Sequence, residues 1–436
     1  MLDPHRIIQW LTARYGKRVF WVAYSGGVDS HVLLHILAKA GMAVKAIHID
    51  HGLHSESANW ARHCAAIAAQ LAVPFVSIPV TVERDAASGL EAAARRARYQ
   101  ALAHYLDETD ILLTAQHQHD QAETVLLQLL RGAGPQGLAA MAPDSKMGAL
   151  HIVRPLLEIG QDDILAYAHE YQLHWIDDPS NDDIRWSRNY VRHAVWPVIE
   201  AHWPAAAQTL ARSASHCAQA QELFTALAER DLAQIVDTRT QALTISKLLA
   251  LSTARQNNVL RYTIQQKQFA LPSTKTLRRI IEEVCLARED AQPLVRWADV
   301  EVRRFQGKLY ILPAHTDADS HRIWHIQSIQ PLDMGHGNTL VWHKAQTQGI
   351  AEQYIHQGLT VRYRQGGERI QISGQRHHQT LKHLFQQWQV PPWQRDRLPL
   401  IFAGETLIAV PGYGISEAVV AKQGAGFIPV LNTGEG

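Results

Sequence analysis

The sequence is poor in cysteine, and its three cysteines stand far apart. Cys64, Cys217 and Cys285 form no CxxC pair and no regular spacing. Neither a disulfide framework nor a paired-cysteine site is therefore expected. This cysteine usage is typical of a reducing compartment, so we predict a cytoplasmic location.

Long apolar runs and a strong net charge are missing as well. No stretch reaches the roughly 18 apolar residues of a membrane span, and Asp3 and Pro4 argue against a signal peptide. The 42 Lys and Arg and 41 Asp and Glu give a net charge of +1, which neither requires nor excludes a nucleic-acid partner. What remains is the profile of a soluble globular chain of 436 residues, 46% of them hydrophobic, with room for two or three domains.

The first 204 residues alternate strand and helix patterns. Short apolar runs predict strands at 19–23, 44–49, 74–78, 111–115 and 173–176. Apolar residues at helical spacing predict helices at 30–39, 57–71 and 90–106, and one that ends at Leu130. This alternation indicates an α/β, Rossmann-like domain over 1–204, in which helices cover both faces of a doubly wound parallel sheet.

The pattern changes beyond residue 204. Residues 205–290 are rich in Ala, Leu and Gln at helical spacing, and 300–312 predict a hairpin that turns at Gln306 and Gly307. We assign 205–315 to a mainly helical domain and 316–358, which has no clear period, to a linker or irregular region. Alternating apolar runs and a short helix at 380–389 predict a small α+β domain over 359–436.

A polar loop, SGGVDS from Ser25 to Ser30, joins the first expected strand to the helix that follows. Its two glycines allow a sharp turn and close approach of a ligand, and the N–H groups at the helix start favour an anion. The loop lacks the lysine of a Walker A motif, which points away from γ-phosphoryl transfer. Asp29 would repel a phosphate unless Mg²⁺ bridges the two groups, so it is the candidate magnesium ligand. A turn capped by Ser or Asp is the alternative.

A second polar segment follows the strand expected at 111–115. Asp120 and Glu123 stand three residues apart at a helix start, so both can face one cleft. Such a carboxylate pair can bind Mg²⁺ or an ammonium group, and lysine's ε-amine would suit it. Acids that only complement the helix dipole are the alternative. His119 and Glu123 also permit a zinc site, but no HExxH motif or third ligand accompanies them.

Basic residues gather at two places. Arg95 and Arg98 share a helix face, where two guanidinium groups can converge on a phosphate or on developing negative charge. Residues 360–400 hold seven Arg or Lys against two acids, with three Tyr or Trp among them. Basic groups interleaved with aromatics suit RNA, and ordinary surface charge over core aromatics is the alternative.

In this order, the segments resemble one family. SGGVDS is similar to the PP-loop of the N-type ATP pyrophosphatases, and further segments resemble the tRNA(Ile)-lysidine synthetase branch of that superfamily. These are HIDHGL from His48; Glu91, Arg95, Arg98 and Tyr99; TAQHQHDQAETVLLQLLRGAGPQGLAAM from Thr114; RPLL from Arg154; Trp175, Asp178, Ser180, Asn181, Arg188, Asn189 and Arg192; Gly366, Gly367 and Glu368; Leu381 and Lys382; and VPPWQRDRLPLI from Val390. The resemblance spans the chain, although the helical middle matches in character rather than in residues.

The resemblance implies a tRNA-modifying ligase. ATP would adenylate the C2 oxygen of the wobble cytidine in an isoleucine tRNA with a CAU anticodon, and the ε-amine of free lysine would then displace AMP. ATP would lie at Ser25, Gly26, Gly27, Val28, Asp29, Ser30 and Asp50, with Mg²⁺ at Asp29. Asp120 and Glu123 would position lysine, and Arg95 and Arg98 would stabilise negative charge. The expected tRNA contacts are Arg188, Asn189, Arg192, Arg362, Arg364, Lys382 and Arg395; a homodimer is a further expectation.

Two positions depart from the family's pattern. Gln116 stands where a His is usual, and His119 stands where the first of two Asp residues is usual. Any metal-binding role of that first Asp therefore has no carboxylate here, and we place the acidic function on Asp120 and Glu123.

Two rival functions remain. A tRNA thiolase of the same superfamily would generally use paired cysteines or an iron–sulfur cluster, which the spacing of the three cysteines disfavours. An RNA-binding protein that holds ATP only as a structural ligand would have little use for the carboxylates of Asp29, Asp120 and Glu123 beside RNA.

Overall fold

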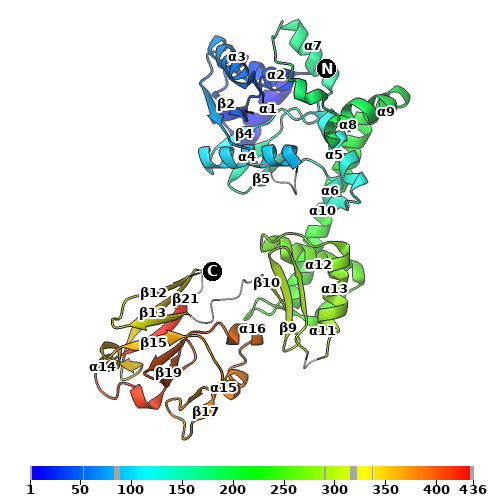
Figure 1. Cartoon of the computed structure of the whole chain (residues 1–436). Helices are drawn as coiled ribbons and strands as arrows, with labels where there is room; N and C mark the ends of the chain where they lie inside the picture. The colour runs from blue at the N-terminus through cyan, green and yellow to red at the C-terminus, as the bar shows by residue number, and fades with distance from the viewer. Residues whose placement is uncertain are drawn as a thin grey trace. The chain divides into compact units, whose positions relative to one another are not determined.

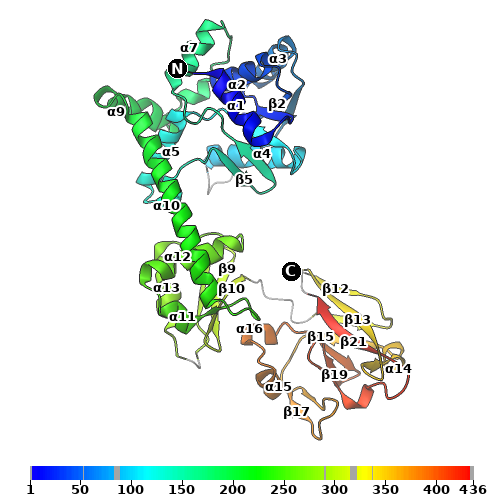
Figure 2. The same cartoon turned by 180° about the vertical axis from the view of Figure 1, so that it is seen from behind.

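The computed structural model describes residues 2–52, 54–82, 89–288, 291–314, 322–335 and 337–432, except for the side chains of 89–92. The chain divides into two compact units, Met1–Leu227 and Ala228–Gly436. Figures 1 and 2 show them from opposite sides. In the described ranges, no helix combines the length and the apolar character needed to cross a membrane.

The first unit is built on a six-stranded sheet in the order β3-β2-β1-β4-β6-β5. Its strands are β1 (Phe20–Ala23), β2 (Val44–Asp50), β3 (Phe75–Pro79), β4 (Ile111–Leu113), β5 (Asp144–Met147) and β6 (Leu150–Val153). All neighbours pair in parallel except β5, which runs antiparallel to β6. The predicted doubly wound α/β fold is confirmed, with an antiparallel strand added at one edge.

Helices cover both faces of this sheet (Figure 1). They are α1 (Pro4–Tyr15), α2 (Val28–Lys39), α3 (Ser57–Gln70), α4 (Gly89–Tyr105) and α7 (Gln161–Glu170). Two helices that follow β4, α5 (Gln118–Leu130) and α6 (Pro135–Leu138), lie beside the helices that end the first unit (Figure 1). Side chains of β1 alternate between the faces: Phe20 and Val22 pack in the cluster that contains residues of α1, α2 and α7, and Trp21 packs with Leu102 of α4. The period of two along β1 therefore fixes which helices lie on which side.

The prediction of a strand at 173–176 is wrong. The sheet's remaining parallel strand is β6, whose LHIV run resembles the LHWI run at 173–176 in length and character. The run that pairs with β4 becomes the strand, and the local pattern of neither run predicts which one pairs. Residues 173–176 instead lie beside the loop after β1, where the Ile176 amide donates to the Gly26 carbonyl at 3.0 Å.

The strand order creates a switch point between β1 and β4. From β1 the chain moves to β2 and β3 on one side, and it then returns to β4 on the other side. Ligands of open α/β sheets bind where the loops diverge, beyond the carboxyl ends of the strands at such a point. The loops after β1 and β4 carry SGGVDS and the Asp120 segment, so both predicted site segments meet there.

The first unit ends in helices, of which α10 is the longest (Figure 2). They are η1 (Pro179–Asp182), α8 (Ser187–Tyr190), η2 (Val191–Val195), α9 (Trp196–His202) and α10 (Ala206–Ile235), which continues into the second unit. Ala122 of α5 packs with Trp196 and with Ala206 and Ala207 of α10. This small cluster fixes α9 and α10 against the helix that carries Asp120.

The second unit begins with a helical region that also contains a sheet. Its elements are β7 (Leu243–Thr244), α11 (Ile245–Leu249), α12 (Thr253–Gln266), α13 (Thr274–Arg279), η3 (Ile280–Cys285), β8 (Leu294–Trp297), β9 (Val300–Phe305) and β10 (Lys308–Pro313). The helices and the β9–β10 hairpin appear as predicted. Gln306 and Gly307 form the turn, both with positive φ.

Residues 322–358 form strands and a short helix, so of the two alternatives predicted for that range the structure has the irregular β region rather than the linker. They form β11 (Ile323–Ile326), β12 (Leu332–Gly335), β13 (Asn338–Gln346), β14 (Ile350–Ala351) and α14 (Glu352–His356). β11 pairs with β15 (Leu359–Arg362), and β13 with β21 (Ala425–Asn432). Only one residue of β13, Leu340, is buried, so the apolar alternation that reveals a strand is weak here. Residues 316–321 and 336 of the predicted linker lie outside the described ranges.

The remaining elements belong to the same C-terminal part. They are β16 (Arg369–Ile370), β17 (Gln379–Thr380), α15 (Leu381–Gln387), α16 (Pro392–Arg395), β18 (Leu400–Ala403), β19 (Thr406–Val410), β20 (Gly414–Ile415) and η4 (Glu417–Val419). The predicted helix at 380–389 is α15. Mixed strands and short helices fit the predicted α+β character.

Candidate active site at the switch point of the sheet

The loop after β1 is braced by its own serines. Ser30 Oγ donates to the Gly27 carbonyl at 3.0 Å and accepts from the Ser25 amide at 3.2 Å. Ser25 Oγ lies 3.1 Å from Ser30 Oγ and accepts from the Gly27 amide at 3.3 Å. The neighbouring Val28 packs against the core. The two hydroxyl groups therefore hold the loop's shape and leave its backbone to face a ligand.

Gly26 is the position in this loop that excludes any side chain. Its φ of +89° lies in the left-handed region, and an added Cβ would stand 2.6 Å from Ile176 Cδ1 and 2.8 Å from Cys64 Sγ. The close approach comes from α3 and from the 173–176 segment. The loop's path is thus fixed by packing from behind as well as by its own hydrogen bonds.

The start of α2 can receive an anion. Gly27 is the N-cap residue and contributes no side-chain capping bond, so the first amide groups of the helix keep their hydrogen-bonding capacity. The helix has 12 residues, and its partial positive charge adds to those donors. Such a terminus after a glycine-rich loop suits phosphate groups.

Asp29 stands at this helix start with an unsatisfied oxygen. Asp29 Oδ1 is buried and has no hydrogen-bond partner, and His117 Nε2 lies 3.7 Å away. Burial raises the pKa of Asp29 above its ordinary value, opposed by the charge of His117. A buried carboxylate oxygen without a partner is costly unless a cation or donor completes it.

The residues present fit Mg²⁺ with one protein ligand. The described ranges hold no group of three or more His, Cys, Asp or Glu arranged around a metal ion. Mg²⁺ usually keeps several waters and binds through one or two carboxylates together with substrate phosphates. The orphaned Asp29 oxygen beside a phosphate-binding helix start is a donor of that kind.

His117 links Asp29 to the second site segment. It is the N-cap of α5, its Nδ1 accepts from the His119 amide at 3.2 Å, and its own amide donates to Asp120 Oδ2 at 3.1 Å. Because Nδ1 is an acceptor, the neutral ring carries its proton on Nε2. That Nε2 lies 3.5 Å from Asp120 Oδ2 and points between the two carboxylates.

Asp120 and Glu123 are joined to two arginines in a cluster of four side chains. Arg188 binds Glu123 Oε2 through Nε at 2.8 Å and Asp120 Oδ1 through Nη2 at 3.3 Å. Arg192 binds Glu123 Oε1 through Nε at 2.6 Å and Asp120 Oδ1 through Nη2 at 3.2 Å. We name these four residues the acid–arginine cluster. It joins the start of α5 to α8 and η2, and it brings together residues that the sequence assigns to lysine and to tRNA.

The cluster balances buried charge. Glu123 is 3% exposed and Asp120 15% exposed, so both carboxylates depend on their partners. Burial alone would raise the pKa of Asp120, but His117, Arg188 and Arg192 together hold it below its ordinary value. Asp120 is therefore ionised at neutral pH, and Glu123 is paired with both arginines.

The residues around this cluster have structural partners. Asn189 Nδ2 donates to the carbonyl groups of Ser180 and Asp183 at 3.0 and 3.1 Å, which ties α8 to η1. His119 turns away from Asp120 toward α9, where its Nε2 lies 3.3 Å from Glu200 Oε1 and its ring packs edge-on against Trp196. Gln116 accepts from the hydroxyl group of Thr114. Both departures from the family's pattern are thus accommodated by local contacts.

The carboxyl end of β2 presents a second polar group. Asp50 Oδ1 accepts from the Gly52 amide at 2.9 Å, which forms the turn after the strand. Arg98 donates to His51 Nε2 through Nε at 3.3 Å, and its Nη2 lies 3.2 Å from the same nitrogen. Burial lowers the pKa of His51 to about 4, with help from the charge of Arg98, so His51 is the neutral acceptor.

The two predicted catalytic arginines of α4 have different partners within the chain. Arg98 reaches His51, whereas the guanidinium of Arg95 lies over the Tyr99 ring, 5.0 Å from its centroid. The side chain of Glu91 lies outside the described part of the chain. His51 and His117 were absent from the candidate residues, and the capping-box spacing between His117 and Asp120 is the signal that indicates His117.

Three of the four C-terminal tRNA candidates have partners in the folded chain. Arg364 Nη1 lies 3.2 Å from Asp396 Oδ1, and Arg395 Nε donates to the Val390 carbonyl at 2.9 Å. Arg362 covers the Phe402 ring at 3.9 Å from its centroid. Lys382 is exposed, and the described residues provide no partner for it.

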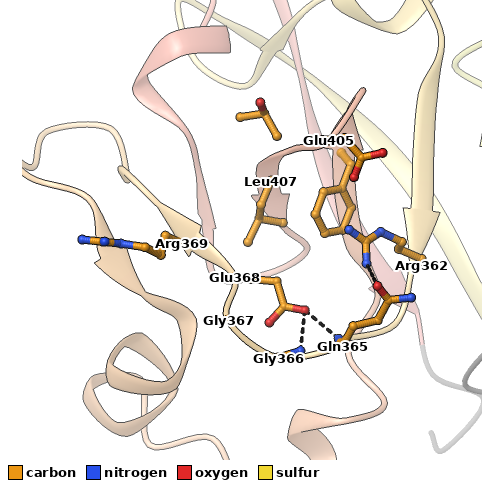
Figure 3. Close-up of a pocket in the computed structure, with 10 residues that line it drawn as sticks. Arg362, Gln365, Gly366, Gly367, Glu368, Arg369, Glu405 and Leu407 are labelled. Atoms are coloured by element: carbon orange, nitrogen blue, oxygen red, sulfur yellow. Dashed lines mark hydrogen bonds between the residues drawn. The ribbon is translucent and has the colours of Figure 1, made fainter.

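A pocket of about 280 Å³ lies beside Arg362 in the C-terminal part (Figure 3). Gly366 and Gly367 turn with positive φ, and Glu368 Oε1 accepts from the amides of Gln365 and Gly366 at 2.6 and 2.9 Å. Glu368 therefore fixes the backbone of Gln365 and Gly366 at the rim of the pocket. The lining mixes Arg362 and Arg369 with Glu368 and Glu405, so its charge is balanced.

Comparisons with known proteins agree with this architecture. Family models match a PP-loop domain at residues 3–199, a TilS substrate binding domain at 243–310 and a TilS substrate C-terminal domain at 359–430. A solved structure of a TILS C-terminal domain covers 26% of this chain and 100% of its own, with 19% identity and a TM-score of 0.21.

Curated relatives match nearly the whole chain. The tRNA(Ile)-lysidine synthase of Coxiella burnetii is 43% identical over 431 residues, which cover 97% of this chain and 95% of the relative. That of Legionella pneumophila strain Paris is 39% identical over 420 residues and covers 96% of each. At this identity and coverage, the chain belongs to the tRNA(Ile)-lysidine synthase family of PP-loop enzymes.

Proposed function

We propose that this chain uses ATP to ligate free lysine to C2 of the wobble cytidine in an isoleucine tRNA with a CAU anticodon. The observation that carries the proposal is the unpartnered buried oxygen of Asp29 at the start of α2. It stands where the glycine-rich loop leads into α2, whose first amide groups have no side-chain cap, and it faces His117 at the acid–arginine cluster. The switch point of the sheet thus holds the parts for phosphate binding and for an amine.

The first step would activate the cytidine. Its C2 oxygen attacks the α-phosphorus of ATP, the bond from that phosphorus to the bridging oxygen breaks, and pyrophosphate leaves. The start of α2 and the backbone of Gly26 and Gly27 would hold the phosphates in line for this attack. Mg²⁺ bound at Asp29 would offset the charge of the phosphates and of the departing pyrophosphate. Arg98, fixed by His51, would reach the same edge of the sheet from α4.

The second step would form the carbon–nitrogen bond. The lysine Nζ attacks C2, the bond from C2 to the activated oxygen breaks, and AMP leaves with that oxygen. The attacking amine must be neutral, so the ε-ammonium group that Asp120 and Glu123 would bind must first lose a proton to a neighbouring carboxylate or to water. Asp120 and Glu123 would orient the amine as it enters. Arg362, Arg364, Lys382 and Arg395 are proposed tRNA contacts, although the first, second and fourth already have partners within the chain.

The rival functions lack support in the structure. Cys64 and Cys285 are buried in different core clusters, and all three cysteines are free, so sulfur transfer by a cysteine pair has no site among the described residues. For a passive ATP-binding protein, a carboxylate with one buried, unpartnered oxygen at the proposed phosphate site would be a cost without a function.

One assay tests the ligase. Purified protein is incubated with ATP, labelled lysine and unmodified isoleucine tRNA, and label in the tRNA is measured together with AMP. Both are expected to rise together, and Asp120→Asn is expected to abolish lysine transfer. Absence of label with AMP at background would refute the proposed reaction. Label transfer near the normal rate in Asp120→Asn would refute the role of Asp120.

A further inference from the structure

The acid–arginine cluster closes the place proposed for lysine. The sequence assigns its acids to lysine and its arginines to tRNA, yet each arginine binds both acids. Two carboxylates against two guanidinium groups leave the cluster neutral, and Glu123 is almost fully buried. A lysine ammonium group can therefore pair with Asp120 and Glu123 only by replacing an arginine.

Each of the two arginines binds the acids through only one edge of its guanidinium group. Arg188 and Arg192 bind the acids through Nε and Nη2. Among the residues described, no acceptor is paired with Nη1 of either arginine. Their side chains are 26% and 36% exposed, so each extends from the buried acids to the cleft surface. A guanidinium group so placed can exchange a carboxylate for a phosphate, because both accept its paired N–H groups.

The cluster also lies close to the phosphate site. The charge of Arg192 acts on Asp29, the residue at the start of α2. His117 stands between Asp29 and Asp120 at 3.7 and 3.5 Å. A guanidinium group that leaves the acids would thus find phosphate groups of a bound substrate within the same cleft.

Building on the proposed ligation, we propose that Arg188 and Arg192 occupy the lysine site until lysine enters. The entering ε-ammonium group takes over Asp120 and Glu123, and the released arginine binds substrate phosphate. The exchange keeps every buried charge paired, because one cation replaces another at the acids. Leaving either acid buried and unpaired would be strongly destabilising.

The exchange makes lysine binding and phosphate binding cooperative. Lysine frees the arginines that phosphate needs, and phosphate holds the arginines away from the acids that lysine needs. By thermodynamic linkage, each ligand must strengthen the other by the same factor. Arg188 and Arg192 are therefore positioning residues that favour assembly of the complete complex.

Binding measurements test this coupling on the full chain. The Kd values of unmodified isoleucine tRNA and of α,β-methylene-ATP are measured by fluorescence anisotropy with and without saturating L-lysine. We expect saturating L-lysine to decrease the Kd roughly tenfold, within the usual range of coupling between sites. If only the Kd of tRNA decreases, the tRNA backbone is the source of the phosphate; if only the Kd of the nucleotide decreases, ATP is the source. L-Norleucine, which lacks the ε-ammonium group, is expected to have no effect. Unchanged Kd values for both ligands would overturn the proposal.

Arg192→Met separates the exchange from general damage. Without this competitor the acids should bind L-lysine several-fold more tightly in calorimetry, while the lysine effect on phosphate binding shrinks. If Arg192 had a merely structural role, its replacement would instead weaken both the binding of L-lysine and the lysine effect on phosphate binding. Arg188→Met gives the same readout if Arg192→Met does not fold. Weaker lysine binding in a folded variant would contradict the exchange. Arg185→Met is the control, since Arg185 is 85% exposed and its side chain pairs with Asp183 and with no other residue that the structure describes; its lysine effect should stay as in the unaltered chain.

The same preparation distinguishes this proposal from the proposed function. If lysine enters tRNA but leaves both Kd values unchanged, the exchange is wrong and the ligation stands. If no lysine enters tRNA and calorimetry detects no lysine binding, the ligation itself fails, and the exchange fails with it.

Discussion

The amide of Ile176 donates a hydrogen bond of 3.0 Å to the carbonyl of Gly26, so a segment 150 residues further along the chain supports the loop after β1 from behind. The Ile176 side chain fills the space that a Cβ on Gly26 would need, at 2.6 Å. The shape of the loop predicted to bind phosphate therefore depends on the closing segment of the first unit.

Gly26→Ala should damage this loop in two ways. Alanine disfavours the φ of +89°, and its methyl group would displace Ile176 and Cys64. We expect a loss of about 1–3 kcal/mol in the free energy of unfolding and a decrease of at least roughly tenfold in ATP-dependent AMP release. Gly41→Ala is the matched control, because Gly41 has a φ of +68° but no atom within 4 Å of an added Cβ. It should lose stability and keep its AMP release; equal losses of activity in both variants would contradict this account.

Asp29→Asn should remove the charge and keep the shape of the phosphate site. The amide cannot offer the anionic oxygen that Mg²⁺ requires, so pyrophosphate release should fall by about 10²- to 10³-fold, as when one electrostatic stabiliser is lost. Stability should rise or stay unchanged, because a buried carboxylate with an unpartnered oxygen is replaced by a neutral group. Asp182→Asn, at an aspartate 83% exposed, is the control. Release within twofold of normal in Asp29→Asn would show that Asp29 only braces the turn.

The sequence predicts the phosphate-binding loop because its signals are local. A strand, two glycines and a helix start follow one another within a few residues, and the structure places them so. The acid–arginine cluster could not be predicted in the same way. Asp120 and Arg192 are 72 residues apart, and their pairing depends on how η2 packs against α5. The resemblance to the family assigned the two acids to lysine and the two arginines to tRNA, and it gave no sign that they pair with each other.

The misplaced strand and the missed strands share a physical cause. The LHIV run of β6 and the LHWI run at 173–176 look alike, and only non-local pairing with β4 separates them. In β13 a single residue is buried, so backbone pairing with β21 stabilises a strand that side-chain patterning hardly marks. Strand identity in both places is set by the partner rather than by the run itself.

His31 should make the stability of the chain depend on pH. It is 2% exposed, and burial lowers its pKa to about 4. The charges of His35, His63 and His174 also lower this pKa when those residues are protonated. Between about pH 6.5 and 4 the unfolded chain therefore binds a proton that the folded chain does not, so stability falls as pH falls through this window. At pH 5 the loss from His31 is about 2 kcal/mol relative to pH 7.5.

His31→Leu should remove that part of the dependence. The free energy of unfolding in urea is measured at pH 7.5 and 5.0, and the difference between the two pH values should be smaller in the variant. His216→Leu is the control, because His216 is exposed on α10 and should leave the difference unchanged. The assignment fails if both variants retain the full dependence on pH.

Lys382 and Arg395 should respond differently to neutral substitution. Lys382 is exposed at the start of α15 without a partner among the described residues, so its ammonium group is free for a tRNA phosphate. Arg395 Nε already donates to the Val390 carbonyl. Lys382→Gln should weaken tRNA binding and reduce the slope of log Kobs against log salt by about 1, as expected when one phosphate contact is lost. Arg395→Gln should instead lower the thermal midpoint and leave the slope nearly unchanged.

Anisotropy titrations of unmodified isoleucine tRNA at several salt concentrations measure both slopes. Equal slope changes in the two variants would show that the contact with Val390 does not keep Arg395 from the RNA, and an unchanged slope in Lys382→Gln would remove Lys382 from the tRNA surface.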